Sequence, residues 1–188
     1  IHTMSVQDDK RTFTGMDMLR YYLLKTEPFD LNVVWNKIFK LDLFNGVEPV
    51  RFPKGRVQED NFTIFRLFLN ANSIVTVNEP LYYYVQRAGS IMANFTRRFM
   101  IDTIESHMYM SDYLMNHCSS VKNELQLYLL NSYVELSRRV CANKCKKECN
   151  DLLIQYKHYV LDHTADTSHN PLWKCKQYIK RLLVKLYY

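Results

Sequence analysis

Two adjacent carboxylates, Glu59 and Asp60, are the residues best placed to do chemistry in this sequence. They follow a loop broken by proline and glycine at 47–57, and they precede a nearly continuous apolar stretch at 61–70. A carboxylate at such a place can take a proton from an attacking hydroxyl group. The positive end of the dipole of the helix that follows favours its ionised form. An ordinary helix N-cap at Asp60 fits the same position.

Cations and aromatic residues surround this pair in the sequence. Lys37, Arg56 and Arg87 are candidates for stabilising negative charge that develops in a reaction. Solvated surface cations fit these three positions as well. For the aromatic residues Trp35 and 82–84 we expect a place in the core rather than a sugar-stacking surface.

Four segments occur in a specific order between residues 33 and 92. They are VVWNKIFKLDLF at 33–44, RFPKGRVQED at 51–60, the apolar stretch, and IVTVNEPLYYYVQRAGSIM at 74–92. This succession resembles the second half of family 2 glycosyltransferases, which have the GT-A fold. Close resemblance covers about a third of the chain. A single Glu-Asp pair has little specificity, whereas the ordered set of four has much more.

The resemblance implies roles for individual residues in an inverting sugar transfer. Asp60 would be the general base, and Glu59 would be its neighbour on the acceptor side. Arg87 and Ser90 would lie near the diphosphate of a nucleotide-sugar donor. The remaining substrate-binding candidates are Lys37, Arg56 and Trp35. The acceptor would be a glycan or a lipid-linked glycan.

One departure from the family pattern concerns the donor-binding half. The family's metal-binding Asp-x-Asp follows a strand of a nucleotide-binding region, and Asp8 and Asp9 instead lie in a polar arm. The chain has only 4 glycines, few for the tight turns of a complete doubly wound fold. We therefore expect Mg²⁺ or Mn²⁺ in a full-length enzyme, no metal site in this chain, and no sugar transfer by this chain alone.

The elements expected to position these residues are mostly helices, so the predicted fold class is α+β and predominantly helical, a partial GT-A fold with a helical C-terminal unit. Apolar residues at three-to-four spacing predict most of the helices, and β-branched or aromatic runs predict short strands, mainly within 47–60 and 73–87. Residues 1–95 form the acceptor-side part, and 96–188 form the C-terminal extension. The expected helices are 15–25, 32–44, 61–70, 97–117, 121–142, 146–162 and one from 171; the expected extended segments are 73–77 and 81–86.

The cysteines and the absence of targeting signals indicate a compartment. Five cysteines, an odd number, and no recognisable signal peptide favour reduced thiols in the cytoplasm. Cys141, Cys145 and Cys149 recur every fourth residue, which predicts one helix face. A zinc site at these residues is the alternative interpretation, although structural zinc sites usually bring a second ligand pair from elsewhere.

The last 18 residues, 171–188, predict an amphipathic helix. Leucines and Ile179 fall on one face, cations fall on the opposite face and beside the apolar stripe, and the segment has no acidic residue. This pattern fits peripheral contact with an anionic membrane surface at the inner face of a membrane, and it also fits ordinary packing on the preceding helices. A helical membrane-association or protein-binding module without catalytic activity is therefore the alternative function. The net charge of +6 is compatible with nucleic acid, but we find no reader motif and predict no nucleic-acid binding.

Overall fold

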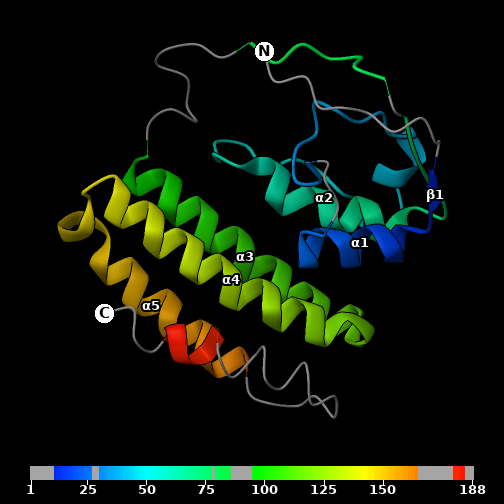
Figure 1. The fold of residues 1–188 in the computed structure, drawn as a ribbon. Coiled ribbons are helices and arrows are strands. Elements are labelled where there is room, and N and C mark those ends of the chain that lie inside the picture. The colour runs from blue at the N-terminus through cyan, green and yellow to red at the C-terminus, as the bar shows by residue number, and fades with distance from the viewer. Residues whose placement is uncertain (1–10, 27–29, 78, 86–94, 165–179, 185–188) are drawn as a thin grey trace. The chain divides into compact units, whose positions relative to one another are not determined.

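The computed structural model describes residues 11–26, 30–77, 79–85, 95–164 and 180–184. The chain divides into two compact units (Figure 1). Unit 1 comprises 1–54 and 59–93, and unit 2 comprises 55–58 and 94–188. The short segment 55–58, just before Glu59 and Asp60, therefore belongs to the unit built from the C-terminal half of the chain.

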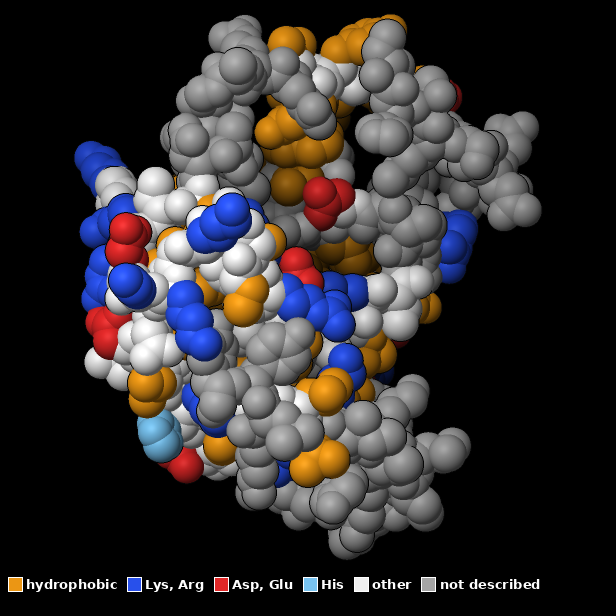
Figure 2. Space-filling view, turned by 60° about the vertical axis from the view of Figure 1, so that its left-hand side comes forward, with side chains coloured by type: hydrophobic (Ala, Val, Ile, Leu, Met, Phe, Trp, Pro, Cys, Tyr) orange, Lys and Arg blue, Asp and Glu red, His pale blue; other side chains and the backbone are white. Residues whose placement is uncertain are grey.

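The predicted α+β, predominantly helical class is confirmed, since helices dominate and the described residues contain a single two-stranded sheet; the partial GT-A fold stays a prediction. The surface drawn in Figure 2 carries many Lys and Arg side chains with hydrophobic side chains between them, in keeping with the positive net charge of the sequence. Within the described ranges, no helix is both long and apolar enough to cross a membrane.

Unit 1 is built on two helices, α1 (Gly15–Leu24) and α2 (Glu59–Asn70), that pack against each other. A capping box begins α1: the Thr14 hydroxyl accepts from the Asp17 N–H, and the Asp17 carboxylate accepts from the Thr14 N–H. Most of the apolar side chains of α2 are buried in the core, including Ile64 and Phe65, which are 0% exposed. Both helices were predicted, α1 from the spacing of its apolar residues and α2 from its nearly continuous apolar sequence.

The sheet of unit 1 differs from the predicted one. β1 (Arg11–Phe13) pairs antiparallel with β2 (Ile74–Thr76), with Thr12 opposite Val75. β2 confirms the predicted strand, but its partner, β1, comes from N-terminal residues for which we predicted no strand. No strand forms within 47–60, and the second predicted extended segment has no sheet partner at 81–85. The polar arm pairs because backbone hydrogen bonds need no apolar pattern.

The predicted helix at 32–44 is wrong. Only its last four residues are helical, as the 3₁₀ helix η1 (Leu41–Phe44). The apolar positions that suggested a buried stripe do not reach the core, since Ile38 is fully exposed and Leu41 is 73% exposed. Residues 30–37 form a turn closed by side-chain hydrogen bonds, and such local bonds compete with helix formation.

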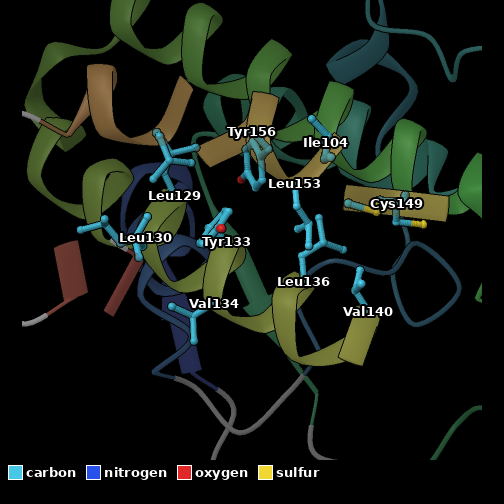
Figure 3. Close-up of a cluster of buried hydrophobic side chains, with 13 residues drawn as sticks. Ile104, Leu129, Leu130, Tyr133, Val134, Leu136, Val140, Cys149, Leu153 and Tyr156 are labelled. Carbon is cyan, nitrogen blue, oxygen red and sulfur yellow. The ribbon is translucent and has the colours of Figure 1, made fainter. Parts of the chain in front are cut away.

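Unit 2 contains three long helices, α3 (Arg97–His117), α4 (Lys122–Ala142) and α5 (Lys146–His163), with a short 3₁₀ helix, η3 (Ser119–Val121), between the first two. Their bounds agree closely with the predicted helices. Figure 3 shows side chains from all three converging on one core, among them Ile104, Tyr133 and Tyr156. The buried Tyr156 hydroxyl is hydrogen-bonded to His107 Nδ1 at 2.9 Å.

The expected single cysteine face is wrong. Cys141 lies at the end of α4, Cys145 precedes α5 and Cys149 lies inside α5. A turn with Lys144 in the left-handed region (φ 54°) separates the two helices, so the every-fourth-residue spacing does not run along one helix. Cys149 is fully buried, and burial is the main cause that raises the pKa of its thiol to about 11.

The end of the chain is described only at 180–184, which is helical. Val184 is fully buried in the core of unit 2, whereas Leu182 is 44% exposed. Arg181 donates to the Leu161 carbonyl at 3.0 Å and to the Thr164 hydroxyl at 2.8 Å, at the end of α5. Residues 180–184 thus pack on the preceding helices. The other residues of the predicted interfacial helix lie outside the described ranges, and its membrane contact stays a prediction.

Candidate functional site

Asp60 is bound to a distant part of unit 1 rather than to its own helix. The Val34 N–H donates to Asp60 Oδ2 at 3.1 Å, across 26 positions in the sequence. Helix α2 begins at Glu59, so Asp60 is its second residue and not the residue that precedes it. The N-cap interpretation of Asp60 is therefore wrong: its carboxylate fixes the turn at 30–37 instead of satisfying the first N–H groups of α2.

The second oxygen of Asp60 has a different environment. Asp60 Oδ1 is buried and has no hydrogen-bond partner among the described residues. Burial, aided by the charge of Glu59, raises the pKa of Asp60, while the Val34 N–H and the charge of Lys37 oppose this change. A carboxylate with one oxygen held and the other without a partner can accept a proton.

Lys37 closes the turn that supplies the Val34 N–H. Its ammonium group donates to the Val33 carbonyl at 2.6 Å, to the Asn36 side-chain oxygen at 2.7 Å and to the Asp30 carbonyl at 3.1 Å. An ammonium group has three donors, so all three are used within residues 30–37. Burial lowers the pKa of Lys37 to about 8, and the charges of Asp30 and Asp60 oppose this shift.

These contacts favour a structural role for Lys37 over direct binding of substrate. A substrate oxygen would have to displace one of three hydrogen bonds of the partly buried ammonium group. Asn36 adds to the closure of the turn, because its side-chain amide donates to the Asp30 carbonyl at 3.0 Å. The turn therefore presents the Val34 N–H from a fixed backbone, and Lys37 acts on Asp60 mainly through that backbone and through its charge.

The aromatic residues expected in the core lie at the surface of unit 1, so that expectation is wrong. Trp35 is 37% exposed and stacks on Tyr82 with ring centroids 4.8 Å apart, and Tyr84 lies 5.2 Å from the same indole. Tyr83 is 89% exposed. Trp35 directly follows Val34 in the chain, so the aromatic cluster of Trp35, Tyr82 and Tyr84 and the Asp60 carboxylate are attached to the same turn.

The other predicted site residues fall into two groups. Arg56 belongs to unit 2, where its guanidinium group donates to Asp102 Oδ1 at 2.7 Å and is also paired with Glu105. These contacts occupy the Arg56 guanidinium group. Binding of substrate by Arg56 stays a prediction. Arg87 and Ser90 lie outside the described residues.

Sequence inspection missed two groups that shape this site, and it also missed the buried Asp102 that pairs with Arg56 in unit 2. The Val34 backbone N–H and the Asp30 carbonyl have no side-chain signature, so no residue pattern could have revealed them. Asp102 could have been noticed as an acidic residue on the apolar-patterned helix 97–117, four positions after Arg98. Within the described ranges, no group of three or more His, Cys, Asp or Glu side chains is arranged to hold a metal ion.

Parts of the chain are similar to two proteins that are named as glycosyltransferases. The chain is 45% identical over 56 residues to the glycosyltransferase GlyG of Streptococcus pneumoniae serotype 4, a match that covers 30% of this chain and 18% of that protein. It is 26% identical over 108 residues to the glycosyltransferase GlyA of the same organism, covering 57% of this chain and 15% of that protein. No family model matches the chain, and no solved structure matches it significantly.

The chain thus spans less than a fifth of the length of the curated relatives it matches. Both relatives are named as glycosyltransferases, and the local similarity supports a role in glycosyl transfer.

Proposed function

We propose that this chain is the acceptor-side part of an inverting, family 2-type glycosyltransferase with a GT-A fold, in which Asp60 is the general base. The observation that carries the proposal is the asymmetric environment of the Asp60 carboxylate. Its Oδ2 accepts from the Val34 N–H, while its buried Oδ1 has no partner in the described part of the chain. The similarity to two glycosyltransferases supplies the class of reaction.

In the proposed step, the Asp60 carboxylate takes the proton of an acceptor hydroxyl group. The hydroxyl oxygen forms a bond to the anomeric carbon of the donor sugar as the bond from that carbon to the nucleoside diphosphate breaks. The electron pair leaves with the diphosphate, and the anomeric configuration inverts. The Val34 N–H holds the carboxylate in place, and burial keeps its pKa above the ordinary value, which makes it a better proton acceptor.

Partners of this site follow from the same proposal. The donor is a nucleotide sugar and the acceptor is a glycan or a lipid-linked glycan. The half-exposed aromatic cluster of Trp35, Tyr82 and Tyr84 offers ring faces to the apolar face of an acceptor sugar. Glu59, the first residue of α2, remains a candidate for contact with the acceptor, and Arg87 and Ser90 for contact with the donor.

A divalent ion, Mg²⁺ or Mn²⁺, would neutralise the diphosphate of the donor in such an enzyme. Among the described residues, no group of three or more His, Cys, Asp or Glu side chains is arranged to hold it. Transfer by the 188 residues alone is not expected. A cytoplasmic location, with peripheral membrane contact through 171–188, belongs to the same proposal.

The stereochemistry of the product tests the proposed reaction. An enzyme that contains this chain together with a donor-binding region should give a glycosidic bond of the opposite anomeric configuration to that of the donor. Nuclear magnetic resonance of the anomeric proton in the first minutes of reaction distinguishes the two outcomes. A product with the configuration of the donor would contradict the inverting mechanism and the role of Asp60 as base.

Activity should depend on pH through two groups of the site. Asp60 must be ionised, which requires a pH above its pKa, and this pKa is raised above the ordinary 3.8 by burial. Lys37 must be protonated to keep all three of its hydrogen bonds, which requires a pH below about 8. We therefore expect kcat/KM to fall at acidic pH as Asp60 gains a proton, and to fall again above about pH 8 as Lys37 loses one.

Substitutions at Lys37 test whether Lys37 causes the decline of kcat/KM above about pH 8. Lys37→Arg keeps its charge well above pH 10 and should lose the decline above pH 8, even if its maximum is lower. Lys37→Met should be less active at every pH and should also lack that decline. A decline near pH 8 that persists unchanged in both variants would show that another group causes it.

A further inference from the structure

A hollow of about 470 Å³ lies at the surface of unit 2, beside α5. All but one of the described residues that line it belong to α5, and the exception, Tyr133, belongs to α4. These two helices pack against each other within unit 2, so a single compact unit fixes the described lining. Sites for small molecules have volumes of about 300–1,000 Å³. The hollow therefore has the size of a site for a small organic molecule.

One wall of the hollow is apolar and belongs to the core of unit 2. Tyr133 and Leu153 line it, and each is 1% exposed because both pack in the buried cluster shared by the three long helices (Figure 3). Ile154 also lines the hollow and is 43% exposed. Because the core holds the buried side chains in place, this wall offers a fixed apolar surface to the carbon part of a ligand.

The rest of the described lining is polar and carries positive charge. Lys146, Asn150 and Lys157 lie on one side of α5, at intervals of four and seven residues. His158 follows Lys157 in the same lining, and none of the described lining residues is acidic. The charge around the hollow therefore favours an anionic group, and the Asn150 amide and the His158 ring add groups that can donate hydrogen bonds.

The positions of the two lysines indicate the length of that anionic group. Eleven positions along an α-helix correspond to about 16 Å at about 1.5 Å per residue. Each ammonium group is carried on a long, flexible stem, so both can reach toward the middle of the hollow, where a diphosphate can contact both more easily than a single phosphate. Asp151, also on α5, does not compete for them, because its carboxylate accepts from Arg97 Nη1 at 2.7 Å.

We propose that this hollow binds an organic diphosphate. The ammonium groups of Lys146 and Lys157 bind the diphosphate oxygens, the Asn150 amide donates to one of them, and the apolar wall contacts the organic part. Inorganic pyrophosphate would satisfy the cations but leave the wall uncovered, so an ester of a nucleoside or of an isoprenoid chain fits better. The site lies in unit 2 and does not depend on the proposed role of Asp60 in unit 1.

Isothermal titration calorimetry of the 188-residue chain tests the site. The probes are uridine diphosphate, farnesyl diphosphate and inorganic pyrophosphate. We expect at least one ester to bind with one-to-one stoichiometry and a Kd below about 1 mM, and pyrophosphate to bind about tenfold more weakly. The tighter of the two esters identifies the source of the diphosphate as a nucleotide or a lipid. Binding of neither ester, or equal affinity for pyrophosphate and both esters, would overturn the proposal.

Lys157→Gln and the control Lys147→Gln locate the binding. Lys157 lines the hollow, whereas Lys147 is an exposed lysine of the same helix that is not among the described lining residues. The Kd of the tighter ester should rise about tenfold in Lys157→Gln, because a hydrogen bond to a charged group is lost, and should stay within about twofold in Lys147→Gln. Equal effects of the two substitutions would assign the affinity to the general positive charge of unit 2 and overturn the site.

Ile154→Ala tests the apolar wall. Ile154 is 43% exposed, so this substitution should leave the fold intact. Affinity for the ester should fall about three- to tenfold through lost apolar contact, while affinity for pyrophosphate should stay within about twofold. An unchanged affinity for the ester would overturn the contact between the wall and the organic part. Transfer assays of Asp60 variants decide the assigned base separately, since none of these binding measurements involves Asp60.

Discussion

Asp60→Asn is expected to lower kcat by about 10²–10⁴-fold, the usual effect of losing a general base. The amide oxygen can still accept the Val34 N–H, so the turn at 30–37 and helix α2 should keep their structure. An amide nitrogen or oxygen does not take up a proton near neutral pH, so the acceptor hydroxyl would lose its proton acceptor. The measurement is steady-state transfer in an enzyme that includes this chain and a donor-binding region.

Binding of the donor should be nearly unaffected in this variant, because the base acts on the acceptor. KM for the nucleotide sugar is expected within about twofold of the wild type. Asp42→Asn is the control: Asp42 lies in the same unit, within the 3₁₀ helix η1, and it should retain full kcat. If purified, folded Asp60→Asn turns over at the wild-type rate, Asp60 is not the base.

The helices that could be predicted were those whose apolar side chains reach a core. The apolar spacing of α3, α4 and α5 corresponds to buried residues such as Met100, Leu130 and Val160. The same spacing failed at 32–44, where Ile38 and Leu41 are exposed. The spacing of apolar residues predicts a helix with one apolar face. Only the folded structure shows whether that face packs against other residues.

The candidate site was predictable in its side chains but not in its contacts. Asp60 and Lys37 stood out because their types and neighbours suit proton transfer and charge stabilisation. Their partners are mostly backbone groups, the Val34 N–H and the carbonyls of Asp30 and Val33. Every residue offers such groups, so only the folded path of the chain decides which of them face a given side chain.

The same limit explains why the surroundings of Trp35 were predicted wrongly and those of Lys37 could not be predicted. Lys37 was a candidate for stabilising charge or a solvated surface cation, and Trp35 was expected in the core. In the structure the ammonium group is held by three acceptors, while the indole is 37% exposed. Local hydrogen bonds close the turn at 30–37. The Lys37 ammonium group is therefore bound by groups of the turn, whereas part of the Trp35 indole lies at the surface.

Gly15→Ala should disrupt unit 1 more than any conservative surface change. Gly15 is the first residue of α1, and its N–H donates to the Ala71 carbonyl at 3.2 Å. A methyl group at this position would lie 1.9 Å from the Phe68 carbonyl oxygen and 2.4 Å from that of Ala71. Both are backbone atoms at the end of α2 and cannot rotate away as a side chain would, so the two helices must separate.

We therefore expect Gly15→Ala to lower the free energy of unfolding of unit 1 by about 3 kcal/mol, the upper part of the range for overpacking, although alanine favours helix over glycine by about 1 kcal/mol. Amide hydrogen exchange of Leu19 and Leu23, both buried in α1, measures this loss. Gly46→Ala is the control, because a methyl group there would come no nearer than 4.0 Å to the Asn70 side chain, and its stability should change by less than about 0.5 kcal/mol. Equal exchange in Gly15→Ala and the wild type would mean that α1 and α2 do not approach as closely as the contact between Gly15 and Ala71 requires.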